Sequence, residues 1–490
     1  MKLTTSRSKL SAIKAAWRKS RGELRAAWLT HDSGARNLIS HLFSLGLLGV
    51  QNPLLNPSPI LAHNTPRSRH TGSAGSPPVT QLRDVQHRPV EDTPQTMRIF
   101  MVCEPAEFGS FKYVKGLIEY LCAHGIQVDY AYSDVRRCSE LDDLITFVES
   151  RGGTTLNLHI GEAPSFSDVS ALFRLFKQIR RGNYDVVHAH CSKAGALARL
   201  IRLAGLPCRV IYTPHAYYGT GKNPSFSVAF FNMIETGLGH VGTTILASDG
   251  EREFALKRLG IPKKRIRQIH NGIPCDSYPP TSPEKKTLAR AKLGLPADAF
   301  VFGTIARYSY QKDPFTLYRA FLPLLQEHPE VWFLHIGDGE MWEAVSALGS
   351  SQRILRLKSL KPIQLFYDAI DVFVLNSRYE GHALAVLEAM SSNKPMILSE
   401  CPGNLDYKEC ELNRVAWVKP EDPDGLLQAL VEQQDKHSLS CNHRDVALVK
   451  FSDQVCYQQV IDEYRHILAT QTIRQNTSQK PASGIKCGLL

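Results

Sequence analysis

Two glutamates and two cations have the residue types and spacing to bind a ligand that carries both hydroxyls and phosphates. The stretch YEGHALAVLEAM places Glu380 and Glu388 eight positions apart, around a glycine and an apolar helical segment. Arg307 and Lys312 lie five positions apart in ARYSYQKDP, directly after a predicted strand. Hydrogen bonds between cations and phosphate contribute about 1.5–3 kcal/mol each, and carboxylates accept hydrogen bonds from hydroxyls. The set therefore predicts a site for a compound such as a nucleotide sugar.

Glycines beside these side chains predict where the backbone meets the ligand. Gly337 follows the predicted strand VWFLHIG, and Gly381 follows the predicted strand DVFVLN. A glycine lets the backbone approach a ligand closely, and the first N–H groups of a helix form an anion site. We therefore expect binding contacts at Gly337, at Gly381 and at the helix start formed by His382, Ala383 and Leu384.

An alternation of short β-rich runs and helical stretches predicts the elements that position this site. The alternation begins at MRIFMVCE (Met97–Glu104), is interrupted by the proline-rich stretch NGIPCDSYPPTSPEKK (Asn271–Lys286), and then restarts. Strands that alternate with helices of this length indicate parallel sheets covered by helices. The sequence thus predicts an α/β protein with two Rossmann-like domains whose parallel sheets face an interdomain cleft.

Five segments are expected along the chain. They are a basic, mostly disordered head at 1–96, an acceptor-side Rossmann-like domain at 97–272, a nucleotide-sugar-binding Rossmann-like domain at 273–452, a helix at 453–471 that returns to the first domain, and a disordered tail at 472–490. The head holds 13 Lys and Arg against 5 Asp and Glu, which leaves +3 of the total +11 for the remainder. So mild a charge does not indicate a nucleic-acid partner.

The head permits two interpretations. Leu10, Ile13, Trp17, Leu24 and Trp28 recur at helical spacing among basic residues, which is typical of a helix lying on an anionic membrane surface. Alternatively, the head is a poorly structured leader, or sequence upstream of a true start at Met97. No stretch reaches the roughly 18–20 apolar residues of a membrane-spanning helix.

Several other classes of protein are disfavoured. The 11 cysteines include no C-x-x-C, which fits reduced thiols in the cytoplasm better than disulfides or a zinc site. The segment GDGEMW lacks the third glycine of a dinucleotide-binding fingerprint, and no P-loop occurs. Asp422-Pro423-Asp424 is expected to open a helix rather than end a strand. We therefore expect neither a metal nor another cofactor.

Six segments in order carry a resemblance to a known family: YDVVHAHCSKAGALARL, VIYTPHAYYG, QIHNGI, GTIARYSYQKDP, HIGDGE and EGHALAVLEAM. From about Met97 to Thr470 the chain resembles the retaining, GT-B fold glycosyltransferases of family four, which build bacterial capsules, exopolysaccharides and lipid-linked saccharides. The resemblance implies a nucleotide diphosphate sugar as donor and a saccharide or lipid-linked saccharide as acceptor. It also implies a cytoplasmic enzyme, with peripheral contact at the inner face of the membrane.

The resemblance implies a role for each matching residue. Glu380 would contact the donor sugar, and Glu388 would hold the ribose hydroxyls. Arg307 and Lys312 would neutralise the departing diphosphate, and the backbone after Gly381 would meet it. The remaining implied contacts are His215, which would face the sugar from the first domain, and Gly109, which would lie near the phosphates and the acceptor. Family members often have an apolar residue at the position of His382, and paired glycines in the first loop.

The implied reaction is transfer of a hexosyl unit with retention. No second carboxylate pair indicates a double displacement, so attack from the side of the leaving group is favoured. Two alternatives stay open: a non-catalytic sugar-nucleotide-binding subunit of a polysaccharide assembly, and a sugar-nucleotide epimerase on the same fold.

Overall fold

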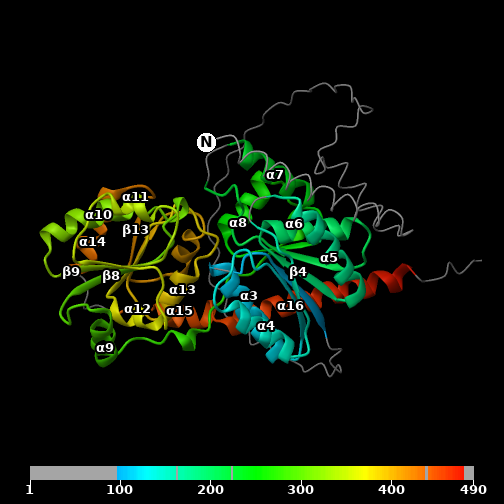
Figure 1. Ribbon diagram of the computed structural model, residues 1–490, viewed down its shortest axis with the longest axis horizontal. Helices are drawn as coiled ribbons and strands as arrows, with labels where there is room; N and C mark the ends of the chain where they lie inside the picture. The colour runs from blue at the N-terminus through cyan, green and yellow to red at the C-terminus, as the bar shows by residue number, and fades with distance from the viewer. Residues whose placement is uncertain (1–96, 107, 162–163, 222–224, 436–439, 479–490) are drawn as a thin grey trace, which may run out of the picture.

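The computed structural model describes residues 97–478 except 107, 162–163, 222–224 and 436–439, with side chains described as far as residue 470. The predicted head at 1–96 and the last part of the predicted tail lie outside these residues. Two α/β domains lie side by side (Figure 1). The prediction of two Rossmann-like domains with parallel sheets is confirmed.

The first domain is built on a seven-stranded parallel sheet in the order β3-β2-β1-β4-β5-β6-β7. Its strands are almost continuously apolar and buried, as parallel strands covered on both faces must be. The strands are β1 (Arg98–Cys103), β2 (Gln127–Tyr132), β3 (Thr155–Asn157), β4 (Val186–His190), β5 (Arg209–Thr213), β6 (Thr243–Leu246) and β7 (Ile266–Gln268). The connecting helices are α3 (Phe108–Ala123), α4 (Leu141–Ser150), α5 (Ser167–Gly182), α6 (Ser192–Leu203), α7 (Phe226–Leu238) and α8 (Asp249–Glu253).

The second domain repeats this plan with a six-stranded parallel sheet in the order β10-β9-β8-β11-β12-β13. The strands are β8 (Phe300–Ile305), β9 (Val331–Ile336), β10 (Ile354–Leu357), β11 (Val372–Leu375), β12 (Met396–Ser399) and β13 (Val415–Val418). The helices are α9 (Pro283–Leu293), α10 (Pro314–Glu327), α11 (Trp342–Ser346), α12 (Gln364–Ala369), α13 (Leu384–Ser391), α14 (Pro423–Asp435) and α15 (His443–Lys450). In both sheets the order changes direction beside the first strand, which is where open α/β sheets bind ligands.

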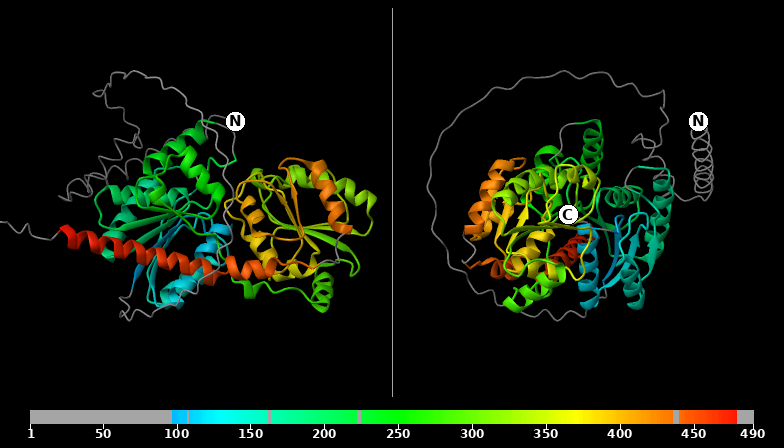
Figure 2. Two further views of the ribbon diagram at one scale, coloured as in Figure 1. Left: turned by 180° about the vertical axis from the view of Figure 1, so that it is seen from behind. Right: turned by 60° about the vertical axis from the view of Figure 1, so that its left-hand side comes forward.

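The chain crosses between the domains twice, and the two crossings lie together. Ile273 N donates to Phe451 O at 3.0 Å, and Asp453 N donates to Ile273 O at 2.8 Å. A Cβ on Gly272 would lie 2.9 Å from Ser452 O, so a larger residue would push the two crossings apart. The second crossing leads into α16 (Asp453–Ser478), which runs along the first domain (Figure 2).

Helix α16 completes the core of the first domain although it ends the described chain. Tyr457, Val460, Ile461 and Tyr464 pack into the cluster that holds β1 and α3. Arg267 also donates to Glu463 at 3.0 Å. Burial of large side chains contributes about 1.5–3 kcal/mol each, so α16 fastens the second domain to the first. The helix continues past the predicted end at residue 471.

Four elements were not predicted from the sequence: the helices α7, α9 and α15 and the strand β13. Helix α7 is uniformly apolar outside its last turns, so it has no helical period that separates a polar face. Strand β13 has only four residues, and it lies at the edge of its sheet.

Candidate active site

The loops that leave the carboxyl ends of the two sheets contact one another. Gly381 follows β11, and a Cβ added to it would lie 3.1 Å from His215 O, in the loop after β5. In the same way, a Cβ on Gly221 would lie 2.3 Å from a ring carbon of Tyr379. The structure therefore brings the predicted residues of the first domain against those of the second.

Glu380 is a buried carboxylate with a complete set of partners. It is 4% exposed, and its Oε1 accepts from Lys312 Nζ and from Ser377 Oγ, each at 2.5 Å. Gln311 Nε2 approaches Oε2 at 3.3 Å. An isolated buried charge would cost several kcal/mol, and the Lys312 cation offsets that cost at this carboxylate. The pairing joins the predicted sugar-binding carboxylate to the predicted phosphate-binding cation.

Glu388 is also buried, at 4% exposure, and its cation comes from the other domain. Lys112 on α3 donates to Glu388 Oε1, and Tyr367 Oη donates to Oε2 at 2.8 Å. Lys112 also donates to Tyr278 Oη at 2.7 Å. Burial opposes the charge on Lys112, but Glu388 outweighs that effect, so the pKa of Lys112 is raised. Sequence analysis missed Lys112, because no local pattern joins residues this far apart.

Arg307 and Gly337 lie at the ends of neighbouring strands. Arg307 is half-buried, and its charge acts on the Tyr379 hydroxyl. Burial and then Glu380 raise the pKa of Tyr379 to about 12, while Arg307 opposes the rise. Gly337 has φ of 152°, and a Cβ there would lie 2.1 Å from Ala306 O. Glycine is thus required where the loop after β9 passes the end of β8.

Two helix N-termini converge at the junction of the domains. Helix α13 begins at Leu384, and Ala383 at its N-cap has no side-chain oxygen to cap the first N–H groups. Helix α3 begins at Phe108, and a Cβ on Gly109 would lie 3.9 Å from Leu384 Cδ1. Helix N-termini carry a partial positive charge and free N–H donors. The arrangement can therefore hold an anionic group near Lys312.

His382 contributes its backbone to this region, whereas its side chain points into the protein. The ring stacks on His270, with centroids 5.0 Å apart, and packs against Tyr407 at 4.9 Å and Phe451 at 5.3 Å. Its carbonyl accepts from Asn271 Nδ2 at 2.8 Å. Burial, then the neighbouring His270, lowers the pKa of His382 well below its usual range. Its position thus suits the apolar residue that sequence analysis expected.

His215 lies at the end of a chain of buried contacts. His190 Nδ1 is 2.9 Å from His215 Nε2, and His190 Nε2 is 2.9 Å from Met101 Sδ. Burial lowers the pKa of His215 to about 4, and burial with the nearby His188 and His215 lowers that of His190 well below its usual range. Both rings are therefore neutral at pH 7.

Met101 sets which atoms donate in this series of hydrogen bonds. A thioether sulfur can only accept a hydrogen bond, so His190 carries its proton on Nε2 and accepts at Nδ1. His215 must then donate from Nε2, which leaves its Nδ1 as an acceptor. His215 thus offers a ligand a hydrogen-bond acceptor rather than a cation. Only the fold shows that His190 orients His215.

A second group holds the backbone of His215. His215 and Ala216 have φ of 57° and 109°, which is a strained conformation for two consecutive non-glycine residues. Glu251, on α8, accepts from Ala247 N at 2.8 Å, and the backbone of Ala216 also stabilises its charged form. Burial nevertheless raises the pKa of Glu251 to about 7. A Cβ on Gly381 would lie 3.2 Å from Glu251 Oε1, so this carboxyl group lies between the strained turn and the donor loop.

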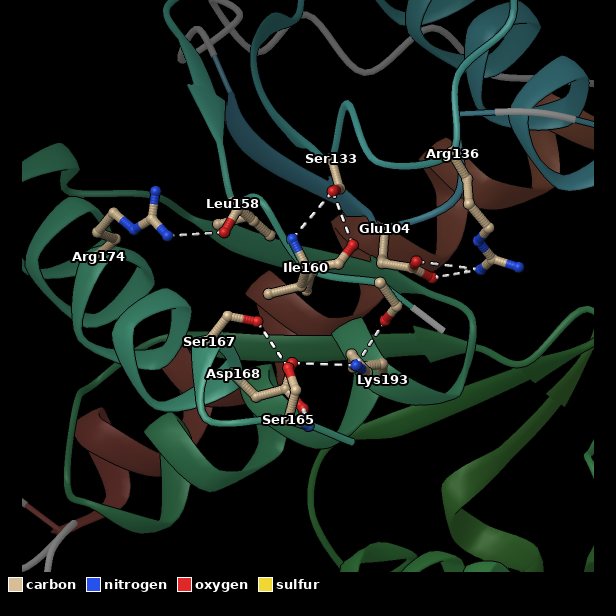
Figure 3. A network of polar contacts seen from close by, with 11 residues as sticks. Glu104, Ser133, Arg136, Leu158, Ile160, Ser165, Ser167, Asp168, Arg174 and Lys193 are labelled. Carbon is tan, nitrogen blue, oxygen red and sulfur yellow. Dashed lines mark hydrogen bonds and ion pairs between the residues drawn. The ribbon is translucent and has the colours of Figure 1, made fainter. Parts of the chain in front are cut away.

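A polar network closes the same edge of the first sheet (Figure 3). Glu104, directly after β1, accepts from Arg136 at 2.8 and 3.0 Å. Lys193, at the start of α6, donates to Asp168 Oδ1 at 3.0 Å and to Gly161 O at 2.5 Å. These charges lie in the segments that follow the carboxyl ends of strands, as does His215, and their pairing fixes the loops of the first domain.

The described part of the chain contains no group of three or more His, Cys, Asp or Glu that could hold a metal ion. No helix in that part is both long and apolar enough to cross a membrane.

Comparison with known proteins decides the family. The profile described as Glycosyltransferase Family 4 matches residues 109–277, and that of Glycosyl transferases group 1 matches residues 299–435. The chain is 31% identical over 283 residues to an Escherichia coli UDP-Gal:alpha-D-GlcNAc-diphosphoundecaprenol alpha-1,3-galactosyltransferase, over 56% of this chain and 72% of that protein. This chain belongs to glycosyltransferase family 4.

Solved structures show the GT-B fold of this glycosyltransferase. Sucrose-phosphate synthase from Thermosynechococcus elongatus aligns with a TM-score of 0.63 at 20% identity, over 76% of this chain and 100% of that one. Anabaena Alr3699/HepE in complex with UDP-glucose aligns with a TM-score of 0.61 at 18% identity, again over 76% and 100%.

The Lys112–Glu388 contact between the domains predicts that two lysines on α3 contribute unequally to stability. Replacing Lys112 with Met leaves Glu388 buried without its cation, so we expect the free energy of unfolding to fall by about 2–3 kcal/mol. This loss is smaller than that for a fully buried pair because Lys112 is partly exposed. Lys115→Met is the control, because Lys115 pairs with Glu119 at 2.7 Å on the surface. Its expected cost is about 0–1 kcal/mol. Equal losses in chemical denaturation would contradict the assignment.

The histidine chain predicts the protonation state of His215. In NMR spectra of ¹⁵N-histidine-labelled protein, assigned with His215→Asn, we expect His215 protonated on Nε2 at pH 7. Since an unfolded histidine titrates near about 6.5, and His215 titrates at about 4, stability should fall as pH drops through this window. Met101→Leu removes the sulfur acceptor and should weaken the tautomer preference. A proton on Nδ1, or a charged ring at pH 7, would refute the assigned direction.

Proposed function

We propose that this glycosyltransferase moves a hexosyl unit from a nucleotide diphosphate sugar to an acceptor hydroxyl with retention of configuration. The observation that carries the proposal is the buried Lys312–Glu380 pair beside the N-terminus of α13. A cation and a helix N-terminus suit a diphosphate, and the carboxylate suits sugar hydroxyls. The UDP-glucose bound to Alr3699/HepE supports a donor of this class.

Donor binding would redistribute the ion pairs and hydrogen bonds of Glu380 and Glu388. The diphosphate would take Lys312 from Glu380, aided by Arg307 and by the N–H groups after Gly381. Sugar hydroxyls would then donate to Glu380 in place of the lysine. Glu388 would accept from ribose hydroxyls once Lys112 turns away. Each exchange replaces one partner of a buried carboxylate with another, so neither carboxylate is left unpaired.

The chemical step would proceed on one face of the sugar. The bond from the anomeric carbon to the phosphate oxygen breaks, and the acceptor oxygen forms its bond on the same face. The acceptor proton passes to the departing phosphate oxygen, so charge and atoms balance. Lys312 and the start of α13 would stabilise the charge that develops on the diphosphate, and His215 would accept a hydrogen bond from a sugar hydroxyl. This scheme assigns no step to a metal ion.

A lipid-linked saccharide is the proposed acceptor. The Escherichia coli relative is named for transfer to a diphosphoundecaprenol-linked sugar, and another relative is a putative Bacillus subtilis glycosyltransferase named EpsD. The first domain would hold this acceptor, and the second would hold the donor. We further propose that the enzyme works in the cytoplasm, at the inner face of the membrane.

The leaving-group role predicts a loss of turnover in Lys312→Ala. Because Lys312 would be most useful when charge develops on the diphosphate, we expect kcat to fall by about 10²–10³ at saturating donor, as for other groups that stabilise transition-state charge. Turnover is measured with a panel of nucleotide sugars, and NMR of the product reports the anomeric configuration. Lys257→Ala, which removes a surface cation paired with Glu253 at 2.6 Å, is the control.

Three results would overturn parts of this proposal. Normal turnover of Lys312→Ala at saturating donor would refute the leaving-group role, and an inverted product would refute retention. An epimerised free sugar nucleotide, formed without acceptor, would favour an epimerase instead.

A further inference from the structure

Helix α7 exposes large apolar side chains to solvent and buries its charged one. Its only charged side chain, Glu235, is 5% exposed and accepts from Arg199 at 2.9 Å and from Tyr212 at 2.8 Å. Val228 and Leu238 are buried, but two large apolar side chains face outward, with Phe226 88% and Met233 60% exposed. A helix on the surface of a globular domain ordinarily has the opposite arrangement. The outward face of α7 therefore indicates a surface that meets something apolar.

The outward side chains form one stripe. Phe226, Phe230 and Met233 are separated by four and three positions, so they lie on the same side of the helix. Phe230 is half-buried, with its ring 5.6 Å from that of Phe231. We call Phe226, Phe230 and Met233 the α7 stripe. No charged residue of α7 lies in it.

The α7 stripe is continuous with the candidate active site. The segment that precedes α7 contains His215, and it contacts the donor loop where Gly221 meets Tyr379. Tyr218, which is 38% exposed, packs its ring 4.6 Å from that of Phe231 on α7. In Figure 1 the helix lies at the outer boundary of the first domain, next to α8.

Two more exposed apolar residues belong to this edge of the first domain. Val135 follows β2 and is 58% exposed, and Phe166 follows β3 and is 48% exposed. Carboxyl ends of parallel strands meet at one edge of a sheet, so both residues share the edge of the loop that holds His215. Val135 and Phe166 thus add apolar surface to an edge that also holds the Glu104–Arg136 and Lys193–Asp168 pairs.

We propose that the α7 stripe docks the enzyme on the lipid bilayer that carries its acceptor, with Phe226 and Met233 entering the interfacial region. The stripe lacks the charges that a charged protein partner would require, and aromatic and flexible apolar side chains suit a membrane interface. Contact at this point would bring the mouth of the site to the head of a lipid-linked acceptor. The inference rests on the proposed function for the identity of that acceptor.

Vesicle binding tests the docking surface without any assumption about catalysis. The full chain is sedimented with vesicles of phosphatidylethanolamine and phosphatidylglycerol. We expect Phe226→Ser combined with Met233→Ser to lower vesicle partition about tenfold or more, because the variant lacks the two apolar side chains that would enter the bilayer. Val449→Ser on α15, which removes a 72% exposed apolar side chain from the second domain, is the matched control and should bind as wild type.

Transfer assays separate docking from the proposed reaction. The double variant should raise KM for a lipid-linked acceptor in vesicles by about tenfold, and leave KM unchanged for the same saccharide on a short soluble carrier. If the wild type glycosylates neither acceptor, the proposed function fails while the vesicle assay still tests the stripe.

Three outcomes overturn the docking proposal. The first is that the wild-type protein does not bind vesicles. The second is that the double variant binds vesicles as the wild type does, although its thermal unfolding curve shows that it is folded. The third is an unchanged vesicle affinity with a loss of self-association, which would make the stripe an interface between copies of the chain.

Discussion

Two carboxylates buried at the junction of the domains constrain the rest of this molecule. Glu380 and Glu388 are each 4% exposed, and ionised groups at such depth are stable only when a cation and hydrogen bonds accompany them. Lys312, in the loop after β8, pairs with Glu380, and Lys112, on α3 of the other domain, pairs with Glu388. The fold must therefore bring three separate segments together before both charges are tolerated.

This constraint also shows how a ligand could be accommodated without leaving either carboxylate unpaired. Each carboxylate has partners that a ligand could replace, because hydroxyls donate as the lysines do and a diphosphate attracts the cation that is released. The convergent starts of α3 and α13 add positive potential without adding another side-chain charge. His215 is held neutral by burial and oriented by His190, so it adds an acceptor rather than a competing cation.

The sequence predicted the architecture well, because parallel sheets depend on local patterns. Buried strands, helices of ordinary length and a proline-rich break at 271–286 were sufficient to predict two Rossmann-like domains. The E-x7-E spacing and the Arg307–Lys312 pair likewise predicted which residues of the second domain gather near the cleft. Their ligand contacts stay predictions.

Contacts between distant parts of the chain could not be predicted in this way. Lys112 was missed because α3 shows only an ordinary surface lysine until Glu388 is placed beside it. Glu251 belongs to no recognisable sequence motif, and only its place beside the turn at His215 and Ala216 shows what it supports. Helix α7 was missed because apolar residues occur around most of it, so its sequence lacks the polar face by which a surface helix is recognised.

The central claim is that Lys312 passes from Glu380 to the donor diphosphate when the donor binds. A crystal structure of the full chain with a bound nucleoside diphosphate tests this most directly. The account predicts that Lys312 Nζ leaves Glu380 Oε1, now 2.5 Å away, and contacts a phosphate oxygen beside the start of α13. A diphosphate bound elsewhere, with the Lys312–Glu380 pair intact, would contradict it.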